Sequence, residues 1–351
     1  SYGIPRVNAS GTLLEGIALW GELKPLLTHE AVKERALRYC DWAVSMGLLA
    51  IRSHVDTCDD RLLAVIYELD DRSEWTDPEC WVKANPGLGT IKDTQKLAEK
   101  VERAKRLPSA VGNLLTKDFN VRDTPAGSWM TFDDIDNDET YDIEEIRDSY
   151  AIGGCDLSAT TDLTCATLIV MKPGSEKKYV LQMYFLPEEL LEKRVREDKI
   201  PYDKWRDRGL LTACPGHQVR YSDVTAWFVK QLNEYSIRPL WIYYDRALAG
   251  YWVEEMENYG FAMQKCAQGA ITFSQPMRML EADLNSKKVN YNNNPVLKWC
   301  LTNTNAKIDD NDNIRPIKGQ SPRLRIDGMV SLLNAYVGLC EKFVDYKTLI
   351  G

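Results

Sequence analysis

The sequence predicts an α/β protein, with a mixed β-sheet flanked by helices and preceded by a mainly helical N-terminal region. Three strand-like segments follow one another through short turns, one of which is the hairpin-type turn Lys172–Pro173–Gly174. Strand-like and helical segments then alternate toward the C-terminus. Antiparallel strands followed by a strand–helix alternation are typical of a mixed sheet covered by helices.

The strand candidates are short and rich in apolar residues. They are residues 150–156, 164–172, 178–185, 239–245 and 261–267. The helix candidates carry apolar residues at helical spacing, and they are residues 187–197, 222–235, 250–258, 274–287 and 325–343. The segment "PLWIYYD" is almost wholly apolar, so we expect it to be a buried parallel strand.

The first half of the chain is less regular. Residues 28–47 are predicted to form a helix with Thr28 as its N-cap and Gly47 as its stop, followed by a strand candidate at 48–56. Loops are expected after residue 65, where Asp, Pro, Gly and Trp are frequent. A charged helical stretch then follows, interrupted at Pro108, and an acidic irregular stretch reads as a linker. The expected segments are 1–65, 66–148 and 149–351.

The composition is that of a globular protein: 351 residues, 44% hydrophobic, 27% charged, with a formal net charge of −8. No apolar run or signal-peptide pattern points to a membrane or to secretion. Nine cysteines without a CxxC pair, beside three histidines, argue against a zinc site and favour reduced thiols in a cytoplasm. The acidic balance argues against a broadly basic nucleic-acid surface. It still allows an acidic site that binds DNA through metal ions.

Three carboxylates occupy positions where a site is expected. Asp156 ends the first strand of the sheet, Asp245 ends "PLWIYYD", and Asp327 opens the helical segment "IDGMVSLLNAYVGLC". If the two strands lie parallel and adjacent, their carboxyl ends meet at the edge where open α/β sheets bind ligands. A helix crossing that edge would bring Asp327 to the same place. Singly, the three have simpler interpretations: an Asx-turn, an ion pair with Arg246 and a helix N-cap.

Together, the carboxylates favour metal chemistry. Neighbouring carboxylates repel one another unless cations lie between them. Two divalent ions about 3.5–4 Å apart relieve this repulsion and form the clamp used in phosphodiester displacement. Oxygen ligands without His or Cys favour Mg²⁺ or Mn²⁺ over Zn²⁺.

Several other residues admit both a functional and a structural interpretation. A group of basic residues before Asp327 is suited to holding DNA phosphates, or else to balancing Asp309, Asp310 and Asp312. The group consists of Lys307, Arg315, Lys318, Arg323 and Arg325. Three aromatic residues are expected in the core rather than in base stacking: Trp241, Trp299 and Tyr243. His217 is a lone loop histidine, and a two-metal site needs no such base.

Six stretches carry a resemblance over residues 66–351: "IYELDDRSEWTDPECWVKANPGLG", "LLTKDFNVRDTPAGSWM", "IGGCDLSATTDLTCATLIV", "WIYYDRALAG", "NNPVLKWCLTN" and "SPRLRIDGMVSLLNAYVG". In this order they resemble the tailed-phage terminase large subunit, from the end of its ATPase domain through its nuclease domain. The resemblance implies a ribonuclease H-like fold and an endonuclease that cuts concatemeric phage DNA during packaging. It implies Asp156, Asp245 and Asp327 as ligands of two Mg²⁺ or Mn²⁺ ions, with Asp162 a weaker candidate. It also implies double-stranded DNA, a terminase small subunit and a portal protein as partners, and leaves homo-oligomerisation open.

The sequence departs from a complete terminase in its first part. The phosphate-binding motif GxxxxGK followed by Ser or Thr does not occur, and Gly87–Leu88–Gly89 reads as a turn. DNA translocation by this chain alone is therefore not expected. Residues 10–64 instead resemble part of a cytosine deaminase-like amidohydrolase, without its HxH metal pair. His54 is expected to be a packed polar residue.

We therefore expect a fusion with its seam near Val65–Ile66. The leading hypothesis is a metal-dependent endonuclease. The alternatives are a deaminase, whose activity the missing ligands argue against, and a catalytically silent assembly module.

Overall fold

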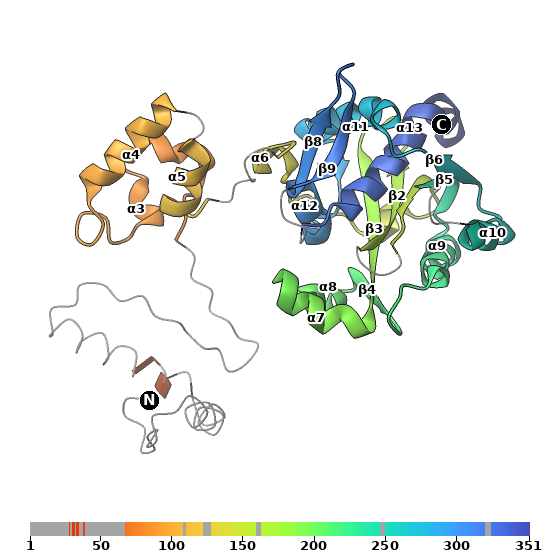
Figure 1. Ribbon diagram of the computed structural model, residues 1–351, viewed down its shortest axis with the longest axis horizontal. Coiled ribbons are helices and arrows are strands. Elements are labelled where there is room, and N and C mark those ends of the chain that lie inside the picture. Colours follow the sequence, from red (N-terminus) through yellow and green to blue (C-terminus); the bar gives the residue numbers. More distant parts are fainter. Residues whose placement is uncertain are drawn as a thin grey trace. The chain divides into compact units, whose positions relative to one another are not determined.

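The computed structural model divides the chain into two compact units, Ser1–Asp123 and Thr124–Gly351 (Figure 1). The described residues are 28, 30, 31, 33, 34, 38, 67–107, 110–121, 128–158, 163–245, 250–319 and 324–351. The predicted strand at 48–56, His54, the seam at Val65–Ile66, Asp162 and Arg323 lie outside them. Near the N-terminus, the Ala31 N–H donates to Thr28 Oγ1 at 3.2 Å, which is the N-cap bond expected of Thr28.

The described part of the first unit is helical. Its elements are η2 (Arg72–Thr76), α3 (Trp81–Ala84), α4 (Thr94–Arg106) and α5 (Val111–Asp118). Asp93 caps α4, because its carboxylate accepts from Gln95 N at 2.8 Å and Lys96 N at 3.2 Å. The buried face of α4 packs against α5 in a small core. Pro108, the predicted interruption, lies outside the described residues; before it α4 ends at Arg106, and after it α5 begins at Val111. The expected loops before residue 91 contain two short helices, η2 and α3.

The second unit is built on a mixed sheet. Its strands are β1 (Tyr150–Asp156), β2 (Thr164–Met171), β3 (Lys178–Pro187), β4 (Leu211–Cys214), β5 (Arg238–Asp245), β6 (Met263–Cys266) and β7 (Val289–Asn290). The described strands follow the order β4-β3-β2-β1-β5-β6, with β7 paired to β3. β1, β2 and β3 are antiparallel, while β1, β5 and β6 are parallel. The strands that end at Asp156 and Asp245 therefore lie parallel and adjacent, which is the condition that the sequence analysis set for a shared site.

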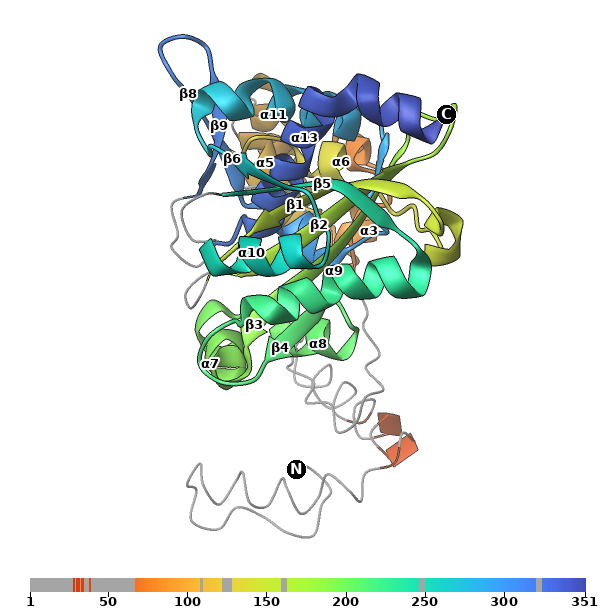
Figure 2. The ribbon, with the colours of Figure 1, turned by 90° about the vertical axis from the view of Figure 1, so that its right-hand side faces the viewer.

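Helices cover both faces of the sheet, as the sequence predicts. They are α6 (Phe132–Ile135), η4 (Ile143–Ile146), α7 (Glu188–Asp198), α8 (Tyr202–Asp207), α9 (Tyr221–Tyr235), α10 (Gly250–Asn258), α11 (Ala270–Asn285), α12 (Pro295–Thr302) and α13 (Asp327–Ile350). Figure 2 shows α9 and α10 on one side of the sheet and α11 and α13 on the other. Each side has its own apolar core. None of the helices in the described part of the chain has the length and apolar character needed to cross a membrane.

Helix α13 lies unusually close to the sheet, and three glycines make this contact sterically allowed. A Cβ added at Gly154 of β1 would lie 2.2 Å from the Ser331 carbonyl oxygen of α13. On the helix, a Cβ at Gly328 would lie 2.1 Å from the Tyr184 hydroxyl oxygen, and one at Gly338 would lie 2.5 Å from the Tyr243 ring. Real side chains do not approach this closely, so any larger residue would push the helix away from the sheet.

The expected linker and the expected boundary near residue 148 differ from the structure. Residues 128–146 belong to the second unit, which begins at Thr124. The Tyr141 hydroxyl donates to the Val180 carbonyl at 2.9 Å, and the Tyr291 hydroxyl donates to the Ile135 carbonyl at 2.7 Å. The acidic composition is typical of a solvated linker, but Ile135, Tyr141 and Ile146 are buried apolar anchors. The sequence reading also missed α8, β4, α12 and the hairpin of β8 (Thr304–Ile308) and β9 (Ile314–Lys318).

We predict that Gly154→Ala lowers the free energy of unfolding by about 2–3 kcal/mol, because the new methyl group overlaps the backbone of α13. Equilibrium denaturation of the full chain measures this change. The control is Gly250→Ala, where an added Cβ meets nothing within 4 Å and the change should stay below about 0.5 kcal/mol. Equal stability of the two variants would contradict the close contact between α13 and β1.

Candidate active site

The carboxyl ends of β1 and β5 point two acidic side chains to one face of the sheet. Side chains two residues apart along a strand share a face. Asp156 follows Gly154 at this spacing, and Asp245 follows Tyr243; both Gly154 and Tyr243 contact α13. In the parallel pairing Cys155 lies opposite Tyr244, so Asp156 and Asp245 occupy the next positions of neighbouring strands. Both carboxylates therefore start from the face of the sheet that α13 covers.

Asp327 is the first residue of α13 and is 5% exposed. The N-terminal turn of a helix stabilises a negative charge because unpaired backbone N–H groups carry partial positive charge there. The close contact of α13 with β1 and β3 holds this turn at the edge of the sheet. Asp327 is thus a buried acidic residue in the first turn of α13.

A buried polar network fixes the start of α13. The Gln182 amide donates to the Gly328 carbonyl at 2.9 Å and to Thr167 Oγ1 at 2.9 Å. Its carbonyl oxygen accepts from the Tyr184 hydroxyl at 2.6 Å. Ser331 Oγ lies 2.7 Å from Thr167 Oγ1 and 3.0 Å from the Cys165 carbonyl. Such a network specifies one position of the helix, because shifting it would leave buried polar groups without partners.

The next turn of α13 is tied to the strand that carries Asp156. The Asn334 amide donates to the Cys155 carbonyl at 2.9 Å. Asp156 is the residue that follows Cys155, so the helix and the end of β1 are held together within one residue of the acidic side chain.

Asp156 and Asp327 line the same cavity, which measures about 440 Å³. Its floor is formed by the end of β1 and the start of α13. A second wall comes from β9, which contributes Arg315 and Lys318. Gln268, between β6 and α11, also lines the cavity and its Nε2 lies 3.5 Å from Asp156 Oδ1. The cavity therefore combines two acidic groups with two basic ones and an amide.

Two buried thiols lie near these acidic side chains. Burial raises the pKa of the Cys165 thiol, and the charges of Asp156 and Asp327 raise it further. Burial likewise raises the pKa of Cys266 to about 12, with added contributions from Glu341 and Asp245. Asp156 and Asp327 thus act on one thiol, while Asp245 acts on a thiol at the far side of β5.

The predicted site residues are therefore brought together in part. Asp156 and Asp327 share the cavity, whereas Asp245 lies on the adjacent strand end without lining it. Across the described ranges, no three His, Cys, Asp or Glu side chains form a group that could hold a metal ion. Gln268 was missed in the sequence, because nothing in a glutamine after a short strand separates it from ordinary loop polarity.

The basic residues expected near Asp327 divide into two groups. Arg315 and Lys318 line the cavity, and Lys307 lies opposite Arg315 in the β8–β9 hairpin. Arg325 does not fit the expected DNA-binding role. Its side chain is 5% exposed and forms a buried ion pair with Asp198 at 3.6 Å, where the Asp198 side chain is 3% exposed. A buried guanidinium that is paired in this way joins the start of α13 to the end of α7 and cannot reach a DNA backbone.

The remaining expectations concern aromatic residues and His217. Tyr243 is buried in the core, and Trp241 and Trp299 pack partly buried against it. The centroid of the Trp299 ring lies 5.5 Å from that of Trp205 and 6.1 Å from that of Tyr202. His217 is exposed, and its Nε2 lies 2.9 Å from Glu189 Oε2. It is not part of the cavity lining. The expected core role of the aromatic residues is confirmed.

The acidic donors on the lining of this cavity are carboxylates, a ligand type that hard divalent cations favour. The order of the sheet, its antiparallel first half and the helices on both of its faces are those of the ribonuclease H-like α/β fold that the sequence predicts.

Comparison with known proteins gives the family. Residues 56–342 match the model described as "Terminase large subunit, endonuclease domain", so the chain belongs to this family. It is 27% identical over 280 residues to the terminase large subunit of Enterobacteria phage HK97, covering 79% of this chain and 54% of that protein. It is 25% identical over 294 residues to protein YmfN of Escherichia coli strain K12, covering 79% and 63%. The crystal structure of the HK97 bacteriophage large terminase covers 86% of this chain and 60% of that chain, with 24% identity and a TM-score of 0.53.

These matches concern the expected domain organisation of the chain. The chain spans about half the length of the HK97 relative. The family match begins at residue 56, inside the stretch that resembles an amidohydrolase. That stretch, residues 10–64, lies outside the described residues except for Thr28 and a few residues between 30 and 38. The proposed fusion stays a prediction.

We predict that Arg325→Met lowers the free energy of unfolding by about 3–5 kcal/mol, because Asp198 would keep a buried charge without its partner. The control is Lys193→Met, which removes an exposed pair with Glu197 at 3.9 Å and should cost less than about 0.5 kcal/mol. Chemical denaturation measures both. Unchanged stability together with weakened DNA binding would restore Arg325 to the DNA-binding group.

Proposed function

We propose that this protein is a metal-dependent DNA endonuclease of the terminase large subunit type. The observation that carries the proposal is the cavity in which Asp156 and Asp327 face a wall bearing Arg315 and Lys318. Acidic groups on one side suit cations that act on a phosphodiester, and basic groups on the other suit the phosphates beside it. The family membership of the chain supports the same reaction.

In this proposal Asp156, Asp245 and Asp327 hold two Mg²⁺ or Mn²⁺ ions. Bound ions of this kind lower the pKa of an attacking water and stabilise the leaving oxygen. Asp162 stays a weaker candidate ligand outside the described residues.

The protein's own residues have separate tasks. The α13 contact and the polar network around Gln182 hold Asp327 in place, so that its carboxylate needs little rearrangement. Gln268 orients the Asp156 carboxylate through its amide. Arg315 and Lys318 would hold the phosphates of the DNA strand on the opposite wall, contacts that do not depend on sequence. Lys307 and Arg323 are proposed to extend this basic surface.

The wider role is also a proposal, because the chain covers only part of the length of its relatives. The substrate is proposed to be concatemeric double-stranded viral DNA, cut during genome packaging in the host cytoplasm. The proposed partners are a terminase small subunit, a portal protein and further copies of this chain.

We predict that Asp156→Asn and Asp327→Asn each lower cleavage of supercoiled plasmid in Mn²⁺ by more than about 100-fold, because each removes a charged ligand from the cavity. Chelation by EDTA should abolish wild-type cleavage, and added Mn²⁺ should restore it. Gel analysis of nicked and linear products measures the rate.

The matched control for these variants is Asp310→Asn, which removes an exposed carboxylate of the β8–β9 turn outside the cavity lining. Its activity should equal that of the wild type. Cleavage by Asp156→Asn at the wild-type rate, or full activity in EDTA, would show that the nuclease assignment of this cavity is wrong.

We predict that Arg315→Ala raises the KM for a duplex substrate about three- to tenfold, with kcat changed less, because Arg315 contacts phosphate rather than the reacting atoms. The control Lys230→Ala removes a basic residue of α9, on the opposite face of the sheet, and should leave KM unchanged. Steady-state kinetics in Mn²⁺ separate the two parameters. An unchanged KM for Arg315→Ala would exclude this wall from DNA binding.

A further inference from the structure

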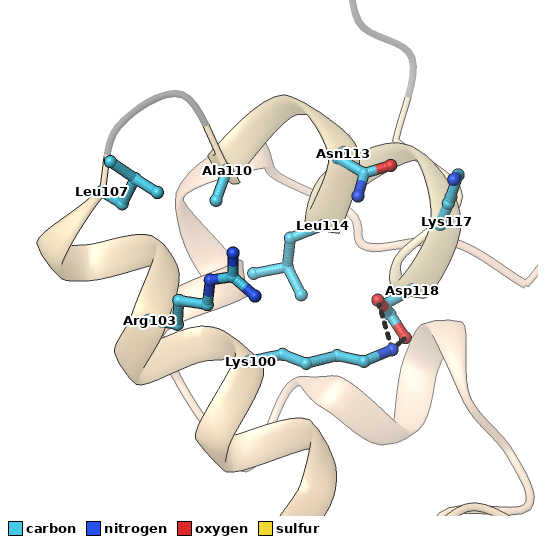
Figure 3. Close-up of a pocket in the computed structure, with 8 residues that line it drawn as sticks. All are labelled: Lys100, Arg103, Leu107, Ala110, Asn113, Leu114, Lys117 and Asp118. Atoms are coloured by element: carbon cyan, nitrogen blue, oxygen red, sulfur yellow. Dashed lines mark hydrogen bonds and ion pairs between the residues drawn. The ribbon is translucent and has the colours of Figure 1, made fainter.

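The described residues of the first unit, which are helical, contain a second polar cavity that the nuclease reaction does not use. It measures about 480 Å³ and lies between α4 and α5. Its lining comprises Lys100, Arg103, Leu107, Ala110, Asn113, Leu114, Lys117 and Asp118 (Figure 3). This volume lies within the range of about 300–1,000 Å³ that is usual for small-ligand sites.

The side chains that line this cavity carry a net positive charge, although the formal net charge of the whole chain is −8. Three cationic side chains line it against one carboxylate, Asp118. Lys100 Nζ lies 2.9 Å from Asp118 Oδ1, and Lys92 Nζ lies 2.9 Å from the same atom. Two ammonium groups thus share one carboxylate, which leaves a net positive charge even at the acidic end of the cavity.

Asp118 serves as an anchor for this arrangement. Burial alone would raise the pKa of its carboxyl, but hydrogen bonds from Lys92 and Lys100 outweigh burial and hold the pKa below its ordinary value. The carboxylate is therefore ionised at neutral pH and keeps Lys100 stretched along the wall, as Figure 3 shows. A preorganised ammonium loses less side-chain entropy when an anion binds.

Arg103 and Lys117 are the other two cationic side chains that line the cavity. Within the described residues 67–107 and 110–121, neither forms an ion pair with a carboxylate. Figure 3 shows the Arg103 guanidinium extending from α4 into the space before α5, where Asn113 and Lys117 are located. A guanidinium, an ammonium and an amide on the lining of one cavity offer several donors to the acceptor oxygens of a phosphate group.

We propose that this cavity binds a phosphate group, and that the phosphate belongs to a DNA backbone. The apolar part of the lining consists of Leu107, Ala110 and Leu114, with no aromatic side chain on which a base could stack. Arg103 and Lys117 are exposed, as contacts to a passing duplex require. A nucleotide offers the same phosphate chemistry and is the other source to be tested.

The experiment compares two double variants of the full chain that lose equal charge. Arg103→Gln with Lys117→Gln changes the cavity, whereas Lys96→Gln with Lys105→Gln changes α4 outside the lining. Glutamine keeps high helix propensity, so both variants should fold. Binding of a short fluorescent duplex is followed by anisotropy across a salt series in EDTA, which removes any contribution from metal ions at the nuclease site.

We expect the cavity variant to bind DNA about tenfold more weakly, with the salt slope reduced by about 1–2, because two phosphate contacts are lost. The control variant should stay within about twofold of the wild type. Equal losses in both variants, or none in either, would overturn the proposal. Manganese-dependent cleavage by the cavity variant at saturating DNA should remain, which separates this site from the nuclease assignment.

A second arm distinguishes the two sources of phosphate. Calorimetric titration with ATP, in the absence of divalent ions, is carried out on the wild type and on both double variants. Weak ATP binding that is equal in all three supports the DNA assignment. Loss of ATP binding in the cavity variant alone, with DNA affinity unchanged, would overturn it in favour of a nucleotide.

Discussion

The close contact of α13 with the sheet is the constraint on which the nuclease unit depends. Gly154 lets the helix backbone lie against β1, and Gly328 and Gly338 let it lie against tyrosines of β3 and β5. Glycine costs conformational entropy in helices and strands, so its use at these three positions is explained by space alone. The buried hydrogen bonds of Ser331 and Asn334 then select one position of the helix along the sheet.

This arrangement determines the electrostatics of the cavity. Asp327 is buried at a helix N-terminus, and Asp156 ends the strand to which that helix is tied. Concentrating carboxylates in this way is unfavourable without positive charge nearby. The cavity provides it through Arg315 and Lys318, whereas Arg325 is used to join α13 to α7 through Asp198. Basic residues that are neighbours in sequence therefore have different physical roles.

The sequence predicted strands well where apolar residues form a continuous run of ordinary strand length. β1, β2, β3 and β5 are apolar runs of ordinary strand length, and their predicted bounds agree closely with the structure. The β8–β9 hairpin was missed because its strands carry Lys307, Arg315 and Pro316, which weaken the apolar signal. The sequence predicts a linker over residues 121–149 because Ile135 and Tyr141 are isolated among acidic residues, and the burial of single anchors leaves no periodicity.

The sequence by itself determined the fold class, the positions of Asp156 and Asp245 at strand ends and the position of Asp327 at a helix start, because strand ends and helix starts are local features. Only the tertiary structure decided that Asp156 and Asp327 share one cavity, that Gln268 joins them and that Arg325 is buried against Asp198. It also revealed the basic cavity between α4 and α5. These features depend on distances between segments far apart in the chain, and residue order does not specify such distances.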